Sequence, residues 1–348
     1  MRDVLLTAMS APRIEDETIA ALAAWQADRM PGYRALFERR GFSPDTMQHW
    51  LEIPAVFTRA FKRYPLFAGS AVAHEFRSSG TSGASAGIAR FSADGLDVMR
   101  EAIRVNAQRM LFPDGRETTV LVLAPSPDDA PHMIMAWGMR EVVRHFGCEG
   151  SGFFVGPDGL DVPRLLAVLE NTDRPVTLIG ASFGFVHLVD ALERRGWSTA
   201  LPEGSRLMDA GGFKGRSREV SATELRSAFS RVFGIAPDHH VNLLGMTELS
   251  SQFYDSTLAS PDEPRRKVNP PWTATRAMDP FTLAPLPEGE VGLLRHLDLA
   301  NLDRPLVIQT DDLGRTVSGG FEVLGRAVND ADRGCSITVD ALAHSEAS

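Results

Sequence analysis

The chain has 348 residues, of which 43% are hydrophobic and 23% charged, so it is long enough to bury one large core or two unequal ones. The formal net charge of −9 disfavours general binding to nucleic acid, and no apolar stretch approaches the roughly 18 residues that a membrane helix requires. Two cysteines, Cys148 and Cys335, exclude a disulfide framework and a cysteine-rich zinc site, and favour the reducing cytoplasm.

The first 75 residues are predicted to form a helical N-terminal part. Ile19, Leu22 and Trp25 recur at helical spacing, which predicts a helix that buries one face. Pro54 and Pro65 interrupt a helix-poor passage that leads from this part into the next segment of the chain.

Residues 76–326 are predicted to form an α/β core. The run TTVLVL at 118–123 is continuously apolar or β-branched, as a strand buried on both faces should be. Alternation of such strands with helices predicts a parallel sheet covered by helices on both faces, and after residue 285 the pattern changes to a small antiparallel β unit. Strands are expected at 118–123, 175–179, 206–209 and 241–244, and helices at 133–146, 183–195 and 223–233.

Six consecutive residues after the N-terminal part are all glycine, serine or threonine. Glycine permits close approach of the backbone to a ligand, and the surrounding N–H and hydroxyl groups can wrap an oxyanion. The segment is not a Walker loop, because no lysine follows it, and an ordinary flexible loop is the alternative. Its members are Ser78, Ser79, Gly80, Thr81, Ser82 and Gly83.

A threonine–glutamate pair follows the strand predicted at 241–244. Gly245 provides a turn, and Thr247 and Glu248 come directly after it. Functional groups in parallel sheets gather at the carboxyl ends of strands, and one carboxylate together with phosphate oxygens is enough to hold Mg²⁺. The alternative is a helix N-terminus, with Thr247 as its cap.

A third polar motif, TDDLG, occupies residues 310–314, and Arg326 follows it. The Asp312 carboxylate is of the kind that accepts hydrogen bonds from ribose hydroxyls, and Arg326 can complete such a contact. The alternative is a surface hairpin turn, because aspartate and glycine are common turn residues.

Taken in order, these motifs resemble those of the adenylate-forming superfamily, with Gly211 and Gly212 resembling its adenine-pocket glycine pair. The resemblance is closest to the acyl-protein synthetase (LuxE-type) and phenylacetate-CoA-ligase-like family. Four longer stretches carry it: IPAVFTRAFKRYPLF at 53–67, GGFKGRSREV at 211–220, GMTELSSQFYD at 245–255 and GRAVNDADRGCS at 325–336.

The resemblance implies the large N-terminal domain of an adenylate-forming enzyme. Its mobile C-terminal domain, which carries a catalytic lysine, is expected to be absent or vestigial, with a short tail at 327–348 in its place. Two further departures are Leu244, where the superfamily usually has an aromatic residue that stacks on adenine, and the missing lysine after Gly83.

The implied activity uses ATP and Mg²⁺ to convert a fatty acid to its acyl-adenylate and then passes the acyl group to a thiol. That thiol is Cys335 of this chain or belongs to a partner reductase or carrier protein, and the alternative for Cys335 is a buried small apolar residue. An aryl, amino or short-acyl ligase that loads a carrier protein, and a non-catalytic subunit that binds nucleotide or acyl ligand, are alternative functions.

The same resemblance assigns a role to each motif. The 78–83 segment would hold the β- and γ-phosphates, and Gly211 with Gly212 would flank adenine. Thr247 would contact the α-phosphate, Glu248 would bind Mg²⁺, and Asp312 with Arg326 would bind ribose.

Overall fold

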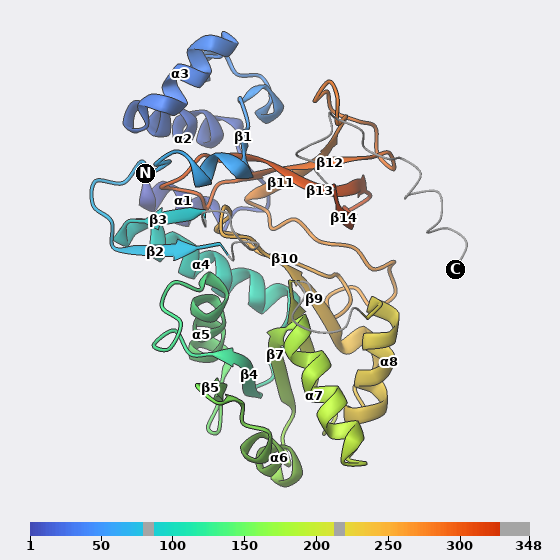
Figure 1. Cartoon of the computed structure of the whole chain (residues 1–348). Coiled ribbons are helices and arrows are strands. Elements are labelled where there is room, and N and C mark those ends of the chain that lie inside the picture. Colours follow the sequence, from blue (N-terminus) through green and yellow to red (C-terminus); the bar gives the residue numbers. More distant parts are fainter. Residues whose placement is uncertain (79–86, 212–219, 328–348) are drawn as a thin grey trace, which may run out of the picture.

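The computed structural model of the chain describes residues 1–78, 87–211 and 220–327. Figure 1 shows a lower part built on a seven-stranded sheet and an upper part built on a five-stranded sheet. The order in the lower sheet is β10-β9-β8-β7-β4-β5-β6, and in the upper sheet β1-β13-β12-β11, with β14 paired to β13. A two-stranded ribbon, β2 with β3, completes the strands of the described residues.

The lower sheet is parallel through its centre. β4 pairs in parallel with β5 and β7, and β7 with β8 and β8 with β9 continue the same direction, whereas the edge strands β10 and β6 are antiparallel. The four strands predicted from apolar runs are therefore confirmed. The lower strands are β4 (Thr119–Pro125), β5 (Gly152–Gly156), β6 (Gly159–Leu160), β7 (Val176–Ala181), β8 (Arg206–Ala210), β9 (His240–Leu244) and β10 (Phe253–Tyr254).

Helices cover both faces of this sheet, as predicted. Side chains alternate along a strand, so Val120 and Val122 lie on one face of β4 and Leu121 and Leu123 on the other. The first face packs against α4 and α5, and the second against α6, α7 and α8. These helices are α4 (Ala93–Met110), α5 (Ile134–Phe146), α6 (Val162–Asn171), α7 (Ser182–Arg194) and α8 (Ala222–Phe233).

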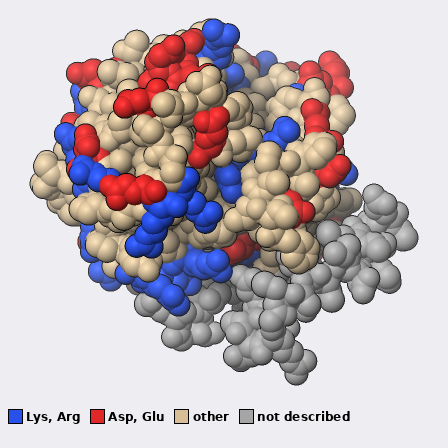
Figure 2. Space-filling model, turned by 90° about the horizontal axis from the view of Figure 1, so that it is seen from above, with Lys and Arg blue, Asp and Glu red and all other residues tan. Residues whose placement is uncertain are grey.

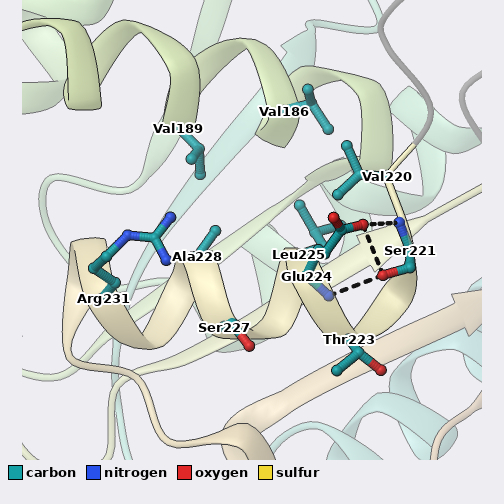
Figure 3. Close-up of a pocket in the computed structure, with 10 residues that line it drawn as sticks. All are labelled: Val186, Val189, Val220, Ser221, Thr223, Glu224, Leu225, Ser227, Ala228 and Arg231. Carbon is teal, nitrogen blue, oxygen red and sulfur yellow. Dashed lines mark hydrogen bonds between the residues drawn. The ribbon is translucent and has the colours of Figure 1, made fainter. Parts of the chain in front are cut away.

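The helix predicted at 223–233 is confirmed, and a capping box explains where it begins. Ser221 Oγ accepts the backbone N–H of Glu224 at 3.1 Å, and the Glu224 carboxylate accepts the N–H of Ser221 at 2.9 Å. Figure 3 shows this cap at one end of a groove of about 310 Å³ between α7 and α8, lined on its apolar side by Val186 and Val189.

The upper part combines the N-terminal helices with strands from the far end of the chain. β1 runs parallel to β13, with Val56 opposite Ile308. The predicted antiparallel unit after residue 285 is confirmed as β12, β13 and β14. The remaining elements of the described residues are α1 (Arg2–Ala8), α2 (Asp16–Arg29), α3 (Pro31–Arg40), η1 (Pro44–Thr46), η2 (Trp50–Glu52), β1 (Val56–Phe57), η3 (Thr58–Lys62), β2 (His74–Arg77), β3 (Ile88–Phe91), η4 (Pro237–His239), β11 (Thr273–Met278), β12 (Val291–Asp298), β13 (Val307–Val317) and β14 (Gly320–Arg326).

Gln26 of α2 ties the N-terminal helices to the loop between β12 and β13. Its side chain is fully buried, and Nε2 lies 2.5 Å from the carbonyl oxygens of both Asn301 and Arg304. Oε1 accepts the backbone N–H of Leu306 at 3.1 Å. One glutamine thus satisfies several backbone groups that burial would otherwise leave without partners.

The surface carries charges of both signs. Figure 2 shows acidic and basic side chains on the same face, seen from above. Over the described residues, no helix is both long enough and apolar enough to cross a membrane.

Candidate active site

The carboxyl ends of β8 and β9 bring two predicted motifs to one edge of the lower sheet. Ala210 of β8 pairs in parallel with Leu243 of β9, so Gly211 leaves the sheet beside Leu244, one residue before Gly245. This is the edge at which parallel α/β sheets bind ligands. Gly211 and the threonine–glutamate motif are therefore neighbours, although a helix and a strand separate them in sequence.

Gly211 requires glycine because of its backbone conformation. Its φ of +74° lies in the left-handed region, and an added Cβ would meet no atom within 4 Å, so the strain of a side chain there would come from the backbone alone. Ser182 Oγ lies 2.9 Å from the Gly211 carbonyl oxygen and 2.5 Å from Asp209 Oδ2. Gly212, its predicted partner at the adenine, lies outside the described residues.

Ser78, the first residue of the predicted phosphate-binding segment, bonds to Gly87, the first described residue after it. The backbone N–H of Ser78 donates to the carbonyl of Gly87 at 2.9 Å, and the N–H of Gly87 donates to Ser78 Oγ at 2.8 Å. These bonds extend the ribbon in which Arg77 pairs with Ile88. The other members of the segment, Ser79, Gly80, Thr81, Ser82 and Gly83, lie outside the described residues.

Thr247 and Glu248 form a turn directly after β9. The alternative that they begin a helix is wrong, because the chain continues through the turn to β10 without helical structure. Burial raises the pKa of the Glu248 carboxyl, while the positive charges of Arg304 and Arg326 act in the opposite direction. The negative charge of Asp312 raises this pKa further, so the turn lies within electrostatic reach of the predicted ribose motif.

Asp312 lies inside strand β13, opposite Arg326 of β14. The hairpin-turn alternative for TDDLG is therefore wrong, since the turn between these strands comes later, at 318–319. Arg326 Nε lies 3.8 Å from Asp312 Oδ1, which is beyond hydrogen-bonding distance. The Asp312 side chain is 18% exposed and that of Arg326 is 70% exposed. Burial raises the pKa of Asp312, and Arg326 opposes that shift.

The end of β12 and the loop that follows it hold the Thr247–Glu248 turn in place. The Asp298 carboxylate accepts the backbone N–H groups of Ser250 and Ser251 at 3.0 and 2.8 Å. Asn301 Nδ2 donates to the carbonyl of Glu248 at 3.0 Å. Sequence reasoning missed both residues, although the polar residues within the segment DLANLDR at 298–304 were a detectable signal.

Leu244 packs partly buried against the upper hydrophobic core. It ends β9 at the position where an adenine-stacking aromatic residue was expected from the superfamily. Cys335, the predicted acyl acceptor, lies beyond residue 327 and therefore outside the described residues, as does nearly all of the predicted tail at 327–348.

The arrangement offers two partly buried carboxyls, Glu248 and Asp312, near the guanidinium of Arg326. Both carboxyl groups have raised pKa values because burial disfavours their ionised forms. A bound cation or a pair of hydroxyl donors would compensate that charge, which fits a metal at Glu248 and a sugar at Asp312. Among residues 1–78, 87–211 and 220–327, no three metal-ligating side chains gather into a preformed metal cage.

Solved structures share this fold. 2-Hydroxyisobutyryl-CoA ligase, in an open conformation in complex with 2-HIB-AMP and CoA, superposes with a TM-score of 0.67 at 14% identity, over 90% of this chain and 74% of that one. ATP-bound MatB from Rhodopseudomonas palustris superposes with a TM-score of 0.52 at 18% identity, over 73% of this chain and 48% of that one. The fold is that of the adenylate-forming ligases, as predicted.

The sequence narrows this class to one family. The family model for acyl-protein synthetase, LuxE, matches residues 23–343, and the chain belongs to that family. It is 26% identical over 326 residues to a long-chain-fatty-acid–luciferin-component ligase of Vibrio harveyi. That alignment covers 88% of this chain and 82% of the relative. A protein of the same name from Aliivibrio fischeri is 28% identical over 274 residues, and the alignment covers 76% of this chain and 69% of that relative. The predicted family is confirmed.

Proposed function

We propose that this protein activates a long-chain fatty acid with ATP as its acyl-adenylate and then transfers the acyl group to a thiol. Membership of the acyl-protein synthetase family supports the reaction type, and the name shared by the Vibrio harveyi and Aliivibrio fischeri relatives supports a long-chain acid. The observation that carries the proposal is the convergence of Glu248, Asp312 and Arg326, from two separate motifs, beside the edge where Gly211 and Gly245 leave the sheet.

In the first step, an oxygen of the fatty-acid carboxylate attacks the α-phosphorus of ATP. The bond between this phosphorus and the bridging oxygen to the β-phosphate breaks, and pyrophosphate leaves. The Thr247 hydroxyl would donate a hydrogen bond to the α-phosphate, and Asp312 would accept hydrogen bonds from the ribose hydroxyls. Such chemistry depends mainly on positioning and on neutralising charge, which these side chains supply.

Glu248 is the side chain we assign to Mg²⁺. One carboxylate together with phosphate oxygens suits this ion, which keeps few protein ligands. When bound, Mg²⁺ supplies positive charge where negative charge accumulates on the phosphates. Glu248 must be ionised for this role; burial raises its pKa, and the positive charges of Arg304 and Arg326 oppose that shift.

In the second step, a thiolate attacks the acyl carbonyl carbon. The bond between this carbon and the phosphate oxygen breaks, and AMP leaves with that oxygen. The thiol loses its proton before the attack, since thiolate is the nucleophilic form. Either Cys335 or a thiol of a partner reductase or carrier protein would serve as acceptor.

ATP–pyrophosphate exchange with fatty, aryl and amino acids tests the proposal. Wild type should exchange with long-chain acids, Glu248→Gln should lose exchange while unfolding at the same urea concentration, and labelled acid should remain on wild type but not on Cys335→Ser. Preference for an aryl, amino or short acid would instead identify a carrier-loading ligase. Exchange that is unchanged in Glu248→Gln would overturn the assignment of Glu248, and no exchange with any acid would indicate a non-catalytic subunit.

A further inference from the structure

Arg304 is a fully buried arginine beside the proposed site, and none of the roles assigned to the motifs involves it directly. It lies in the loop between β12 and β13, and its guanidinium stacks 3.7 Å from the centre of the Phe91 ring. Its Nη2 atom donates to Ser250 Oγ at 2.7 Å and to Asn301 Oδ1 at 2.8 Å. Arg304 therefore joins three separate segments of the chain.

Two of these segments belong to the proposed site. Phe91 ends β3, the strand that follows residues 79–86 and so leaves the predicted phosphate-binding segment. Ser250 follows the Thr247–Glu248 turn by two residues, and Asn301, which Arg304 also contacts, donates to the Glu248 carbonyl. The guanidinium thus contacts the end of β3, the strand after the predicted phosphate-binding segment, and also Ser250 after the Thr247–Glu248 turn. Through Asn301 it is linked to the Glu248 carbonyl.

Burial of this cation is costly and incompletely compensated. Nε and Nη1 are buried without a hydrogen-bond partner among the described residues. Burial lowers the pKa of Arg304 to about 10, against the attraction of Asp303, Asp298 and Glu248. Packing alone would favour an apolar side chain of similar volume here, because a buried charge contributes little net stability. The arrangement is better explained by a role at the site.

We propose that Arg304 is a positioning residue for adenylation: stacked on Phe91 and bonded to Ser250, it fixes the Thr247–Glu248 turn relative to the strand that leaves the phosphate-binding segment. The proposal rests on the proposed adenylating function. Arginine suits the role because its planar guanidinium stacks on a ring face while it donates at its edge, which a lysine ammonium cannot do.

Two variants separate this role from simple support of the fold. Arg304→Lys keeps the charge but loses the planar stack and the fork of donors, and Ser250→Ala removes one acceptor while leaving Arg304 in place. The matched control is Arg206→Lys in the lower sheet. Arg206 is also buried, lies 5.6 Å from the Phe112 ring centre, and makes two bonds to Asp114.

The readouts are ATP–pyrophosphate exchange, with kcat and KM for ATP determined separately, and the Mg²⁺ concentration that gives half-maximal exchange. Substitution of a residue that orients a metal ligand typically lowers metal affinity or activity by about 10- to 100-fold. We expect Arg304→Lys to lower kcat and raise the half-maximal Mg²⁺ concentration within that range, with Ser250→Ala shifted in the same direction. Arg206→Lys should leave kcat and the half-maximal Mg²⁺ concentration unchanged, even if its melting temperature falls as much as that of Arg304→Lys.

Two results would overturn the proposal. One is an Arg304→Lys variant with wild-type kcat and Mg²⁺ dependence, which would leave the proposed function standing. The other is an equal change in Arg206→Lys, which would reduce the effect to stability. If wild type shows no exchange at all, the proposed function fails separately, and the rise in melting temperature with ATP and Mn²⁺ becomes the readout. An equal rise in wild type and Arg304→Lys would then reject the positioning role.

Discussion

Asp312→Asn should weaken the use of ATP without weakening the fold. Asparagine has nearly the shape of aspartate but removes the negative charge. A hydrogen bond to a charged group contributes about 1.5–3 kcal/mol, so its loss should lower kcat/KM for ATP by about 10- to 150-fold. The Asp312 carboxyl is 18% exposed, and its distance of 3.8 Å from Arg326 leaves its oxygens available to a ligand.

Stability should change in the opposite direction. Because burial raises the pKa of Asp312, the folded protein holds the Asp312 proton more tightly than the unfolded chain does. Ionisation as pH rises above the ordinary carboxyl range therefore reduces wild-type stability. Asp312→Asn lacks this penalty, so in urea unfolding its stability relative to wild type should be higher at pH 7 than at pH 4.

The assay is ATP–pyrophosphate exchange with ATP, 2′-deoxy-ATP and 3′-deoxy-ATP. Wild type should discriminate against at least one deoxynucleotide, and Asp312→Asn should lose that discrimination, as a double-mutant cycle requires when the two groups interact. Asp311→Asn is the matched control, because adjacent residues of a strand point to opposite faces. An Asp312→Asn variant that still prefers ATP over both analogues would refute the assignment of Asp312 to ribose.

Two further predictions concern buried polar groups of the upper part. Burial lowers the pKa of His296 to about 3, so between pH 7 and pH 5 only the unfolded chain takes up its proton. This histidine should therefore contribute a loss of about 2 kcal/mol of unfolding free energy over the interval, measured in urea as the amount by which the change in wild type exceeds the change in His296→Gln. Equal changes in both proteins would contradict this reasoning. Gln26→Leu leaves buried carbonyl groups of the β12–β13 loop without donors and should cost about 3 kcal/mol, whereas Gln48→Leu at an exposed position should cost little; similar urea midpoints for the two variants would count against it.

Local pattern was sufficient for the elements of the lower sheet. Strand β4 was predictable because every position from Thr119 to Ala124 is buried, which demands a continuous apolar or β-branched run. The start of α8 was predictable because Ser221 and Glu224 form a capping box within four residues. Helix α4 and the ribbon of β2 with β3 went unpredicted, although the buried residues of α4 recur at helical spacing from Val98 to Met110.

The sequence by itself determined the family and the order of the chemical groups, because several short motifs seldom occur in one set order by coincidence. The tertiary structure alone decided where those groups lie. The Thr247–Glu248 pair suits a helix start as well as a turn, and it is a turn because Asp298 and Asn301 bind the backbone that follows it. Asp312 suits a hairpin turn, and it lies in a strand because β14 pairs along β13. Both outcomes depend on contacts between segments far apart in the chain, which local pattern does not encode.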